Sequence, residues 1–79
     1  MRIKILYFAQ LADLAGKAEE VREFSSITVK ELYKQLAQEY QLPHKFSQLQ
    51  VAVNHELCAH KKELHDGDSI AFLPPMTGG

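Results

Sequence analysis

The sequence predicts an α+β fold in which one helix packs across one mixed β-sheet. Apolar residues alternate in segments 2–8 and 49–53, as they do in β-strands, and a further strand is expected at 69–73 after an Asp-Gly-Asp turn. One longer segment, from residue 28 to about residue 41, repeats apolar residues with the period of an α-helix. Because this helix lies between strands along the chain, a right-handed crossover and some parallel pairing are expected. A helix layer on a sheet layer satisfies this order.

The N-terminal part predicts two strands and a short helical turn. Segment 2–8 has apolar side chains on both faces, which indicates a central strand. One face comprises Ile3, Ile5 and Tyr7, and the other comprises Leu6 and Phe8. Residues 11–15, followed by Gly16, are typical of a helical turn closed by a glycine cap. The charged segment 17–24 is expected to form a second strand at an edge of the sheet.

The main helix has both a start and a stop signal. Thr28 can cap its N-terminus while Glu31, three residues later, reaches back in a capping box. Pro43 disfavours helical geometry at the preceding residue, so the helix should end near Gln41. The predicted apolar stripe comprises Val29, Leu32, Leu36 and Tyr40, with Tyr33 and Ala37 beside them.

The C-terminal part predicts two further strands. Segment 49–53 should stop at the turn-prone residues 54–55. Segment 57–64 is expected to be short and irregular. Residues 66–68, Asp-Gly-Asp, predict a turn before the last strand at 69–73.

Length and composition are those of one small globular domain. The 79 residues leave no room for a second core, and 46% hydrophobic with 24% charged residues argues against disorder. Nine basic and ten acidic residues give a formal net charge of −1, so neither a nucleic acid nor a membrane is expected as partner. Residues 1–5 lack the features of a signal peptide, and Cys58, the only cysteine, cannot form an intrachain disulfide. We therefore expect a cytoplasmic protein.

Internal residues give weak candidates for chemistry. His55 and His60 are five residues apart, whereas a helical zinc-binding His-Glu-x-x-His motif needs a spacing of four. With Cys58 they would supply three zinc ligands from one short segment, which is cramped. Surface histidines and a half-buried cysteine are the simpler interpretation, and nothing in the sequence around Cys58 marks it as a nucleophile. We expect no metal site and no catalytic residue within the domain.

The strongest functional feature is the segment 74–79, called the tail here. It reads Pro74-Pro75-Met76-Thr77-Gly78-Gly79. The prolines end strand pairing and hold the chain extended, and the glycines allow another backbone to approach closely. Six extended residues reach roughly 20 Å, enough to enter a deep pocket of another protein. The sequence thus predicts a domain at 1–73 and a tail at 74–79 whose carboxylate can be activated; a frayed terminus is the alternative.

Several stretches, in order along the chain, form a joint pattern that covers essentially its full length. They are 5–10 with 14–16, 28–32, 51–54, 65–68, and 71–75 leading to Gly78 and Gly79. This pattern resembles the small subunit of molybdopterin synthase, a sulfur carrier. The resemblance implies a ubiquitin-like β-grasp fold, which agrees with the predicted element order.

The resemblance also implies a role for the tail. In this family an adenylyltransferase similar to the ubiquitin-activating enzyme uses ATP and Mg²⁺ to adenylate the terminal glycine, here Gly79. A sulfur donor system then converts it into a thiocarboxylate. The tail enters the large synthase subunit, which holds the catalytic residues, and its sulfur passes to cyclic pyranopterin monophosphate during molybdenum cofactor biosynthesis. The usual assembly has two small and two large subunits, and the carrier itself holds no cofactor.

Matching positions in the family assign further residues. Phe8, Leu57 and Leu73 would form the apolar docking surface, with core packing as the alternative for each. Pro74, Pro75 and Gly78 would shape the inserted tail. Three other functions stay open: a thiamine-pathway sulfur carrier, a ubiquitin-like modifier joined to lysines, and a β-grasp interaction module without an activated terminus. The double proline, residues 8–10 and the chain length favour the molybdopterin pathway over the thiamine pathway.

Overall fold

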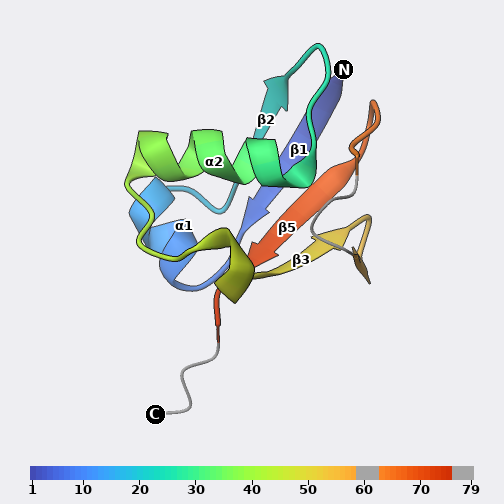
Figure 1. The fold of residues 1–79 in the computed structure, drawn as a ribbon. Coiled ribbons are helices and arrows are strands. Elements are labelled where there is room, and N and C mark those ends of the chain that lie inside the picture. Colours follow the sequence, from blue (N-terminus) through green and yellow to red (C-terminus); the bar gives the residue numbers. More distant parts are fainter. Residues whose placement is uncertain (59–62, 76–79) are drawn as a thin grey trace.

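The computed structural model describes residues 1–58 and 63–75, which form one mixed sheet and one long helix (Figure 1). The elements are β1 (Arg2–Tyr7), α1 (Gln10–Ala15), β2 (Glu19–Glu23), α2 (Val29–Tyr40), the 3-10 helix η1 (Phe46–Gln48), β3 (Gln50–Val53), β4 (Glu56–Leu57) and β5 (Ser69–Leu73). The sheet order is β2-β1-β5-β3-β4, with β1 and β5 parallel and the other pairs antiparallel. The predicted α+β architecture is confirmed. Across the described residues, the longest helix is too short and too polar to cross a membrane.

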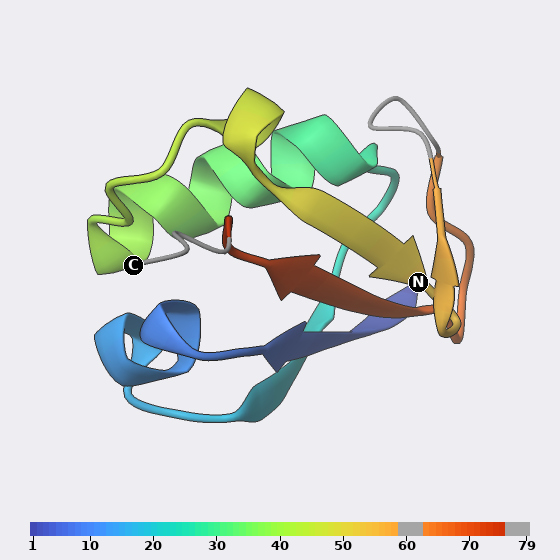
Figure 2. The same ribbon diagram turned by 90° about the horizontal axis from the view of Figure 1, so that it is seen from below.

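The strand register assigns the side chains of the sheet to two faces. Ile5 of β1 lies opposite Ile70 of β5, and Ile70 lies opposite Val53 of β3, so these side chains share one face. Helix α2 packs across this inner face (Figure 2). The core there comprises Ile3, Ile5, Val51, Val53, Ile70 and Phe72 of the sheet and Val29, Leu32 and Leu36 of α2. The opposite, outer face is not covered by any helix in the described part of the chain.

Helix α2 begins and ends where the sequence predicts. The Thr28 hydroxyl accepts a hydrogen bond from the Glu31 backbone N–H at 3.2 Å, and the Glu31 carboxylate accepts one from the Thr28 N–H at 3.0 Å. This is the predicted capping box. At the other end, Gln41 adopts a left-handed conformation and its N–H bonds the Ala37 carbonyl, closing the helix before Pro43.

Two short elements differ from the prediction. Residues 54 and 55 form the predicted turn, both with positive φ, but the chain then returns as β4 rather than starting an irregular segment at Leu57. Such a two-residue turn has the twist that an antiparallel hairpin requires, so it pairs Glu56 and Leu57 with β3. Segment 46–48, for which no structure is predicted, forms η1.

The turn that follows β1 places an alanine in an unfavourable conformation. The Leu11 N–H bonds the Phe8 carbonyl at 3.0 Å, and Ala9 between them has φ 50° and ψ −127°. This conformation belongs to the first central position of a type II′ turn, where glycine is strongly preferred because it has no Cβ. The following helix α1 ends at Gly16, whose left-handed conformation confirms the predicted cap.

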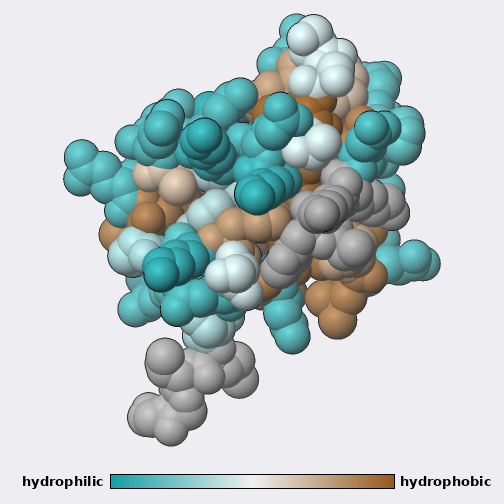
Figure 3. All heavy atoms as spheres, viewed as in Figure 1, coloured by the Kyte–Doolittle hydropathy of each residue, from teal (hydrophilic) through white to brown (hydrophobic). Residues whose placement is uncertain are grey.

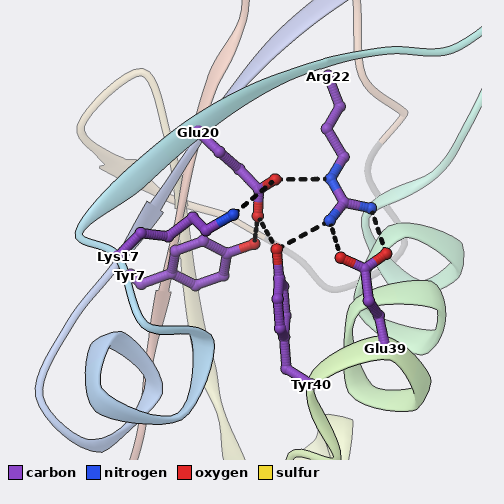
Figure 4. A network of polar contacts seen from close by, with 6 residues as sticks. All are labelled: Tyr7, Lys17, Glu20, Arg22, Glu39 and Tyr40. Atoms are coloured by element: carbon purple, nitrogen blue, oxygen red, sulfur yellow. Dashed lines mark hydrogen bonds and ion pairs between the residues drawn. The ribbon is translucent and has the colours of Figure 1, made fainter.

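Edge strand β2 is held to the rest of the domain by a polar network on the inner face (Figure 4). At its centre, the Glu20 carboxylate accepts hydrogen bonds from the Tyr7 hydroxyl, from the Tyr40 hydroxyl at 2.7 Å and from Arg22 Nε at 2.8 Å. Lys17 Nζ lies 3.8 Å from the same carboxylate. Burial alone would raise the pKa of Glu20, but these hydrogen bonds outweigh it and lower the pKa to about 2.

Arg22 extends the network from β2 to α2. Its guanidinium donates to both carboxylate oxygens of Glu39 and, at 2.9 Å, to the Tyr40 hydroxyl. The hydrogen bonds to Glu39 raise the pKa of Arg22 despite its partial burial, so the guanidinium stays charged. Burial and the hydrogen bond to Glu20 raise the pKa of Tyr7, which keeps this hydroxyl a donor. The network therefore joins β1, β2 and the C-terminal end of α2.

We predict that Glu20→Gln removes a pH-dependent part of the stability. Because the pKa of Glu20 is lower in the folded protein than its ordinary value of 4.5, its stabilisation is complete above that pH and is lost as the pH falls toward 2. Urea unfolding should show the variant less stable than the wild type by about 2 kcal/mol at pH 7, with the difference shrinking toward zero near pH 2. Glu19→Gln, a change at the exposed neighbour on the other face, is the control. A difference that stays constant with pH would contradict this role.

We also predict that Ala9→Gly stabilises the protein. Alanine in this region of φ and ψ carries strain of about 1–3 kcal/mol, which exceeds the entropy that glycine gains in the unfolded chain. Since Ala9 is exposed, the change removes no packing. The urea midpoint should rise by the equivalent of about 1 kcal/mol with an unchanged m-value. Ala12→Gly, inside α1, should instead destabilise the protein. An equal loss of stability in both variants would refute the strain at Ala9.

Candidate functional site

The three residues predicted to form a docking surface meet on the outer face of the sheet. Phe8 follows β1, Leu57 lies in β4 and Leu73 ends β5. All three line one shallow hollow of about 310 Å³. The sheet order β1-β5-β3-β4 thus brings Phe8 and Leu57, which are 49 positions apart in the sequence, to a common surface.

The strand register explains the hollow. Leu6 of β1 lies opposite Ala71 of β5, which lies opposite Ala52 of β3, which in turn lies opposite Leu57 of β4. Directly paired residues point to the same face, so one apolar row crosses four strands. Its two central members are alanines, and the larger leucines stand at its ends. Because the alanine side chains on β5 and β3 are small, the surface between the two leucines is hollowed.

Exposure distinguishes this surface from ordinary core. The side chains of Phe8 and Leu57 are 45% and 67% exposed, which excludes core packing as their role in the isolated chain. Leu73 is half-buried. The polar residues that line the hollow are Ser69 and His55, so it carries no carboxylate. An exposed apolar surface of this kind is typical of protein interaction sites.

The opposite side of the molecule has a different character. Hydrophilic side chains predominate over α2, with hydrophobic atoms showing in several separate places around it (Figure 3). The hollow and helix α2 therefore lie on opposite sides of the sheet.

Strand β5 leads directly from the hollow to the tail. Leu73 lines the hollow and is the last residue of β5, and it is followed by half-buried Pro74 and exposed Pro75. This end of β5 lies at the opposite end of the domain from the N-terminus (Figure 1). The predicted functional residues Gly78 and Gly79 lie outside the described residues.

The weak metal candidates are only partly described. His55 is exposed at the β3–β4 turn and also borders the hollow. Cys58 is a half-buried thiol that packs against the core, and its N–H bonds the Val51 carbonyl at 3.0 Å. His60 lies outside the described residues. Within residues 1–58 and 63–75, no three His, Cys, Asp or Glu side chains are grouped to hold a metal ion.

Comparison with known proteins gives matches along nearly the whole chain. The model of the ThiS family matches residues 5–79. The chain is 38% identical over 82 aligned positions to the molybdopterin synthase sulfur carrier subunit of Escherichia coli, covering 98% of this chain and 99% of that protein.

Two solved structures share the fold. SAMP1 from Haloferax volcanii superimposes with a TM-score of 0.80 at 22% identity over the full length of both chains, a likeness that shows the β-grasp fold alone. A chain in the complex of subunits 1 and 2 of molybdopterin-converting factor from Helicobacter pylori gives a TM-score of 0.69 at 25% identity, again over both full lengths.

These matches bear out the resemblance that the sequence suggests, including its β-grasp fold. This chain is a member of the ThiS family and a homologue of the molybdopterin synthase sulfur carrier subunits.

Proposed function

We propose that this protein is the sulfur carrier subunit of a molybdopterin synthase. The observation that carries the proposal is the continuity of the outer-face hollow with the tail, because Leu73 belongs to one and leads into the other. Such an arrangement lets a partner hold the domain by its apolar face while the tail enters the partner's active site. The names of the homologous proteins agree with this function.

In this proposal the carboxyl group of Gly79 is the reactive group. A separate adenylyltransferase joins it to AMP from Mg²⁺–ATP and releases pyrophosphate. Sulfur from a donor system then displaces AMP, which leaves a thiocarboxylate. Glycines at positions 78 and 79 suit this chemistry, because the lack of a Cβ lets a nucleotide and an enzyme backbone approach the terminal carbonyl.

The large synthase subunit is the proposed partner for sulfur transfer to cyclic pyranopterin monophosphate, in an assembly of two small and two large subunits. The solved complex of two subunits of molybdopterin-converting factor supports a partner of this kind. Docking through Phe8, Leu57 and Leu73 would supply affinity, and Pro74 and Pro75 would direct Gly78 and Gly79 inward. The tail would then present its sulfur at high effective concentration to the catalytic residues of the large subunit. We place this chemistry in the cytoplasm, with no cofactor held by the carrier.

The proposed chemistry predicts a change in the mass of the protein. Incubation with a cognate adenylyltransferase, Mg²⁺–ATP and a sulfur donor should increase the intact mass by about 16 Da, the difference between oxygen and sulfur. The matched control is the chain that lacks Gly79, which should fold with unchanged stability and gain no sulfur. An unchanged wild-type mass, under conditions that convert a known carrier, would refute the sulfur-carrier function. Lysine-linked adducts of high mass in cell extracts would indicate a protein modifier instead.

The proposed docking surface predicts the effect of a substitution in the hollow. Leu57→Ser should weaken binding to the large subunit about tenfold, since burying a leucine side chain contributes roughly 1.5–3 kcal/mol and part of that surface is already shielded. The free energy of unfolding should change little, because the side chain is 67% exposed. Titration calorimetry measures the first effect and urea unfolding the second.

Val21→Ser is the matched control for this substitution. Val21 is an exposed apolar residue, 54% accessible, which pairs with Lys4 and so lies on the same outer face, but it is outside the hollow. Its substitution should leave the affinity unchanged. Equal losses in both variants would show that the whole face, rather than the hollow, binds the partner.

A further inference from the structure

A second apolar groove lies on the other side of the sheet, between α2 and η1. It has a volume of about 350 Å³ and is lined by Lys30, Tyr33, Lys34, Ala37, Gln38 and Phe46. No part of the hollow on the outer face contributes to it. We call it the helix groove.

Aromatic packing fixes the floor of the helix groove. The Tyr33 ring lies 5.8 Å from the Phe46 ring and 5.3 Å from that of Phe72 in the core, measured between centroids. Its hydroxyl donates a 2.8 Å hydrogen bond to the His44 carbonyl, which ties the loop after α2 to the helix. Ala37, one turn further along α2, leaves space beside these rings. The floor is therefore both preformed and apolar.

One wall of the helix groove is positively charged. Lys30, Lys34 and Gln38 are spaced four residues apart, so they form one row along α2 of roughly 12 Å at 1.5 Å per residue. Neither lysine forms an ion pair with any residue in the described part of the chain. The neighbouring Glu31 is turned toward the Thr28 N–H by the capping box. No carboxylate lines the groove to balance the two charges.

From this combination we infer that the helix groove binds a short acidic segment of a partner protein that carries one apolar side chain. The apolar side chain covers Tyr33, Ala37 and Phe46, and two carboxylates pair with Lys30 and Lys34. A row of 12 Å accommodates about four extended residues. The inference does not rest on the sulfur-carrier function.

The helix groove and the hollow lie far enough apart on the domain, on opposite sides of the sheet, for both to be occupied at once. Because α2 covers the inner face and the hollow opens on the outer face, one partner can occupy the groove while another holds the hollow and the tail. Two proteins could thus hold this chain at the same time, and one need not release it before the other binds.

The test is a titration of ¹⁵N-labelled protein with the capped peptide acetyl-Glu-Glu-Phe-Glu-Glu-amide, followed by NMR. Amide shifts should saturate in residues 30–38 and 46–48 and should be absent from residues 52, 57 and 71 on the outer face. The peptide in which glutamine replaces every glutamate should bind at least about fivefold more weakly, because two surface ion pairs are lost. Raising the salt concentration should weaken the acidic peptide only.

Matched variants locate the charges. The double substitution Lys30→Gln and Lys34→Gln should reduce affinity for the acidic peptide about fivefold, as two exposed ion pairs predict. Arg2→Gln with Lys4→Gln removes the same charge from the outer face and should leave the affinity unchanged. Saturating shifts on the outer face, equal affinity for the glutamine peptide, or no saturable shift at all would each overturn the inference.

Discussion

The parallel pairing of β1 with β5 is the contact on which the rest of the structure depends. It joins the first strand to the last described strand at the centre of the sheet. A parallel connection requires a crossover, and α2 supplies it on the inner face, where it covers the core. The same register sets Leu6 beside Ala71 on the outer face and brings Phe8 and Leu73 to the same end. Core, hollow and the base of the tail thus follow from one strand pair.

In edge strand β2 charged side chains point toward the inner, helix-covered face and the apolar side chain points toward solvent, the reverse of the usual arrangement. Its inner side chains, Glu20 and Arg22, are charged and belong to the network, whereas Val21 points outward and is exposed. A half-buried carboxylate is tolerated there because each of its oxygens has a hydrogen-bond donor. Hydrogen bonds and ion pairs, together with the edge-to-face contact between the Tyr7 and Tyr40 rings, therefore close this edge of the core and join β2 to the C-terminal end of α2.

Local rules were sufficient to predict the long elements, since each rests on nearby residues. The capping box of Thr28 and Glu31 and the alternation in β1 and β3 are of this kind. Two-residue β4 has too few residues for a periodic signal and exists only because β3 is beside it. The network of Glu20 depends on Tyr40, twenty residues away, and no spacing rule connects them. The turn at Ala9 could not be predicted, because the sequence signal for such a turn is a glycine and this position holds an alanine. The docking residues came from family resemblance, and their meeting in one hollow could be seen only in the structure.

The attachment of the tail has a mechanical consequence. It continues from β5, which is hydrogen-bonded along both edges, to β1 on one side and β3 on the other. A pull on the tail along the strand direction would therefore load two ladders of hydrogen bonds in shear, so that many must break together. A tail attached to an edge strand would load one ladder instead of two, and a tail attached to two-residue β4 would load only its short pairing with β3. A pull on the inserted tail would therefore move the whole domain before any strand separated from the sheet.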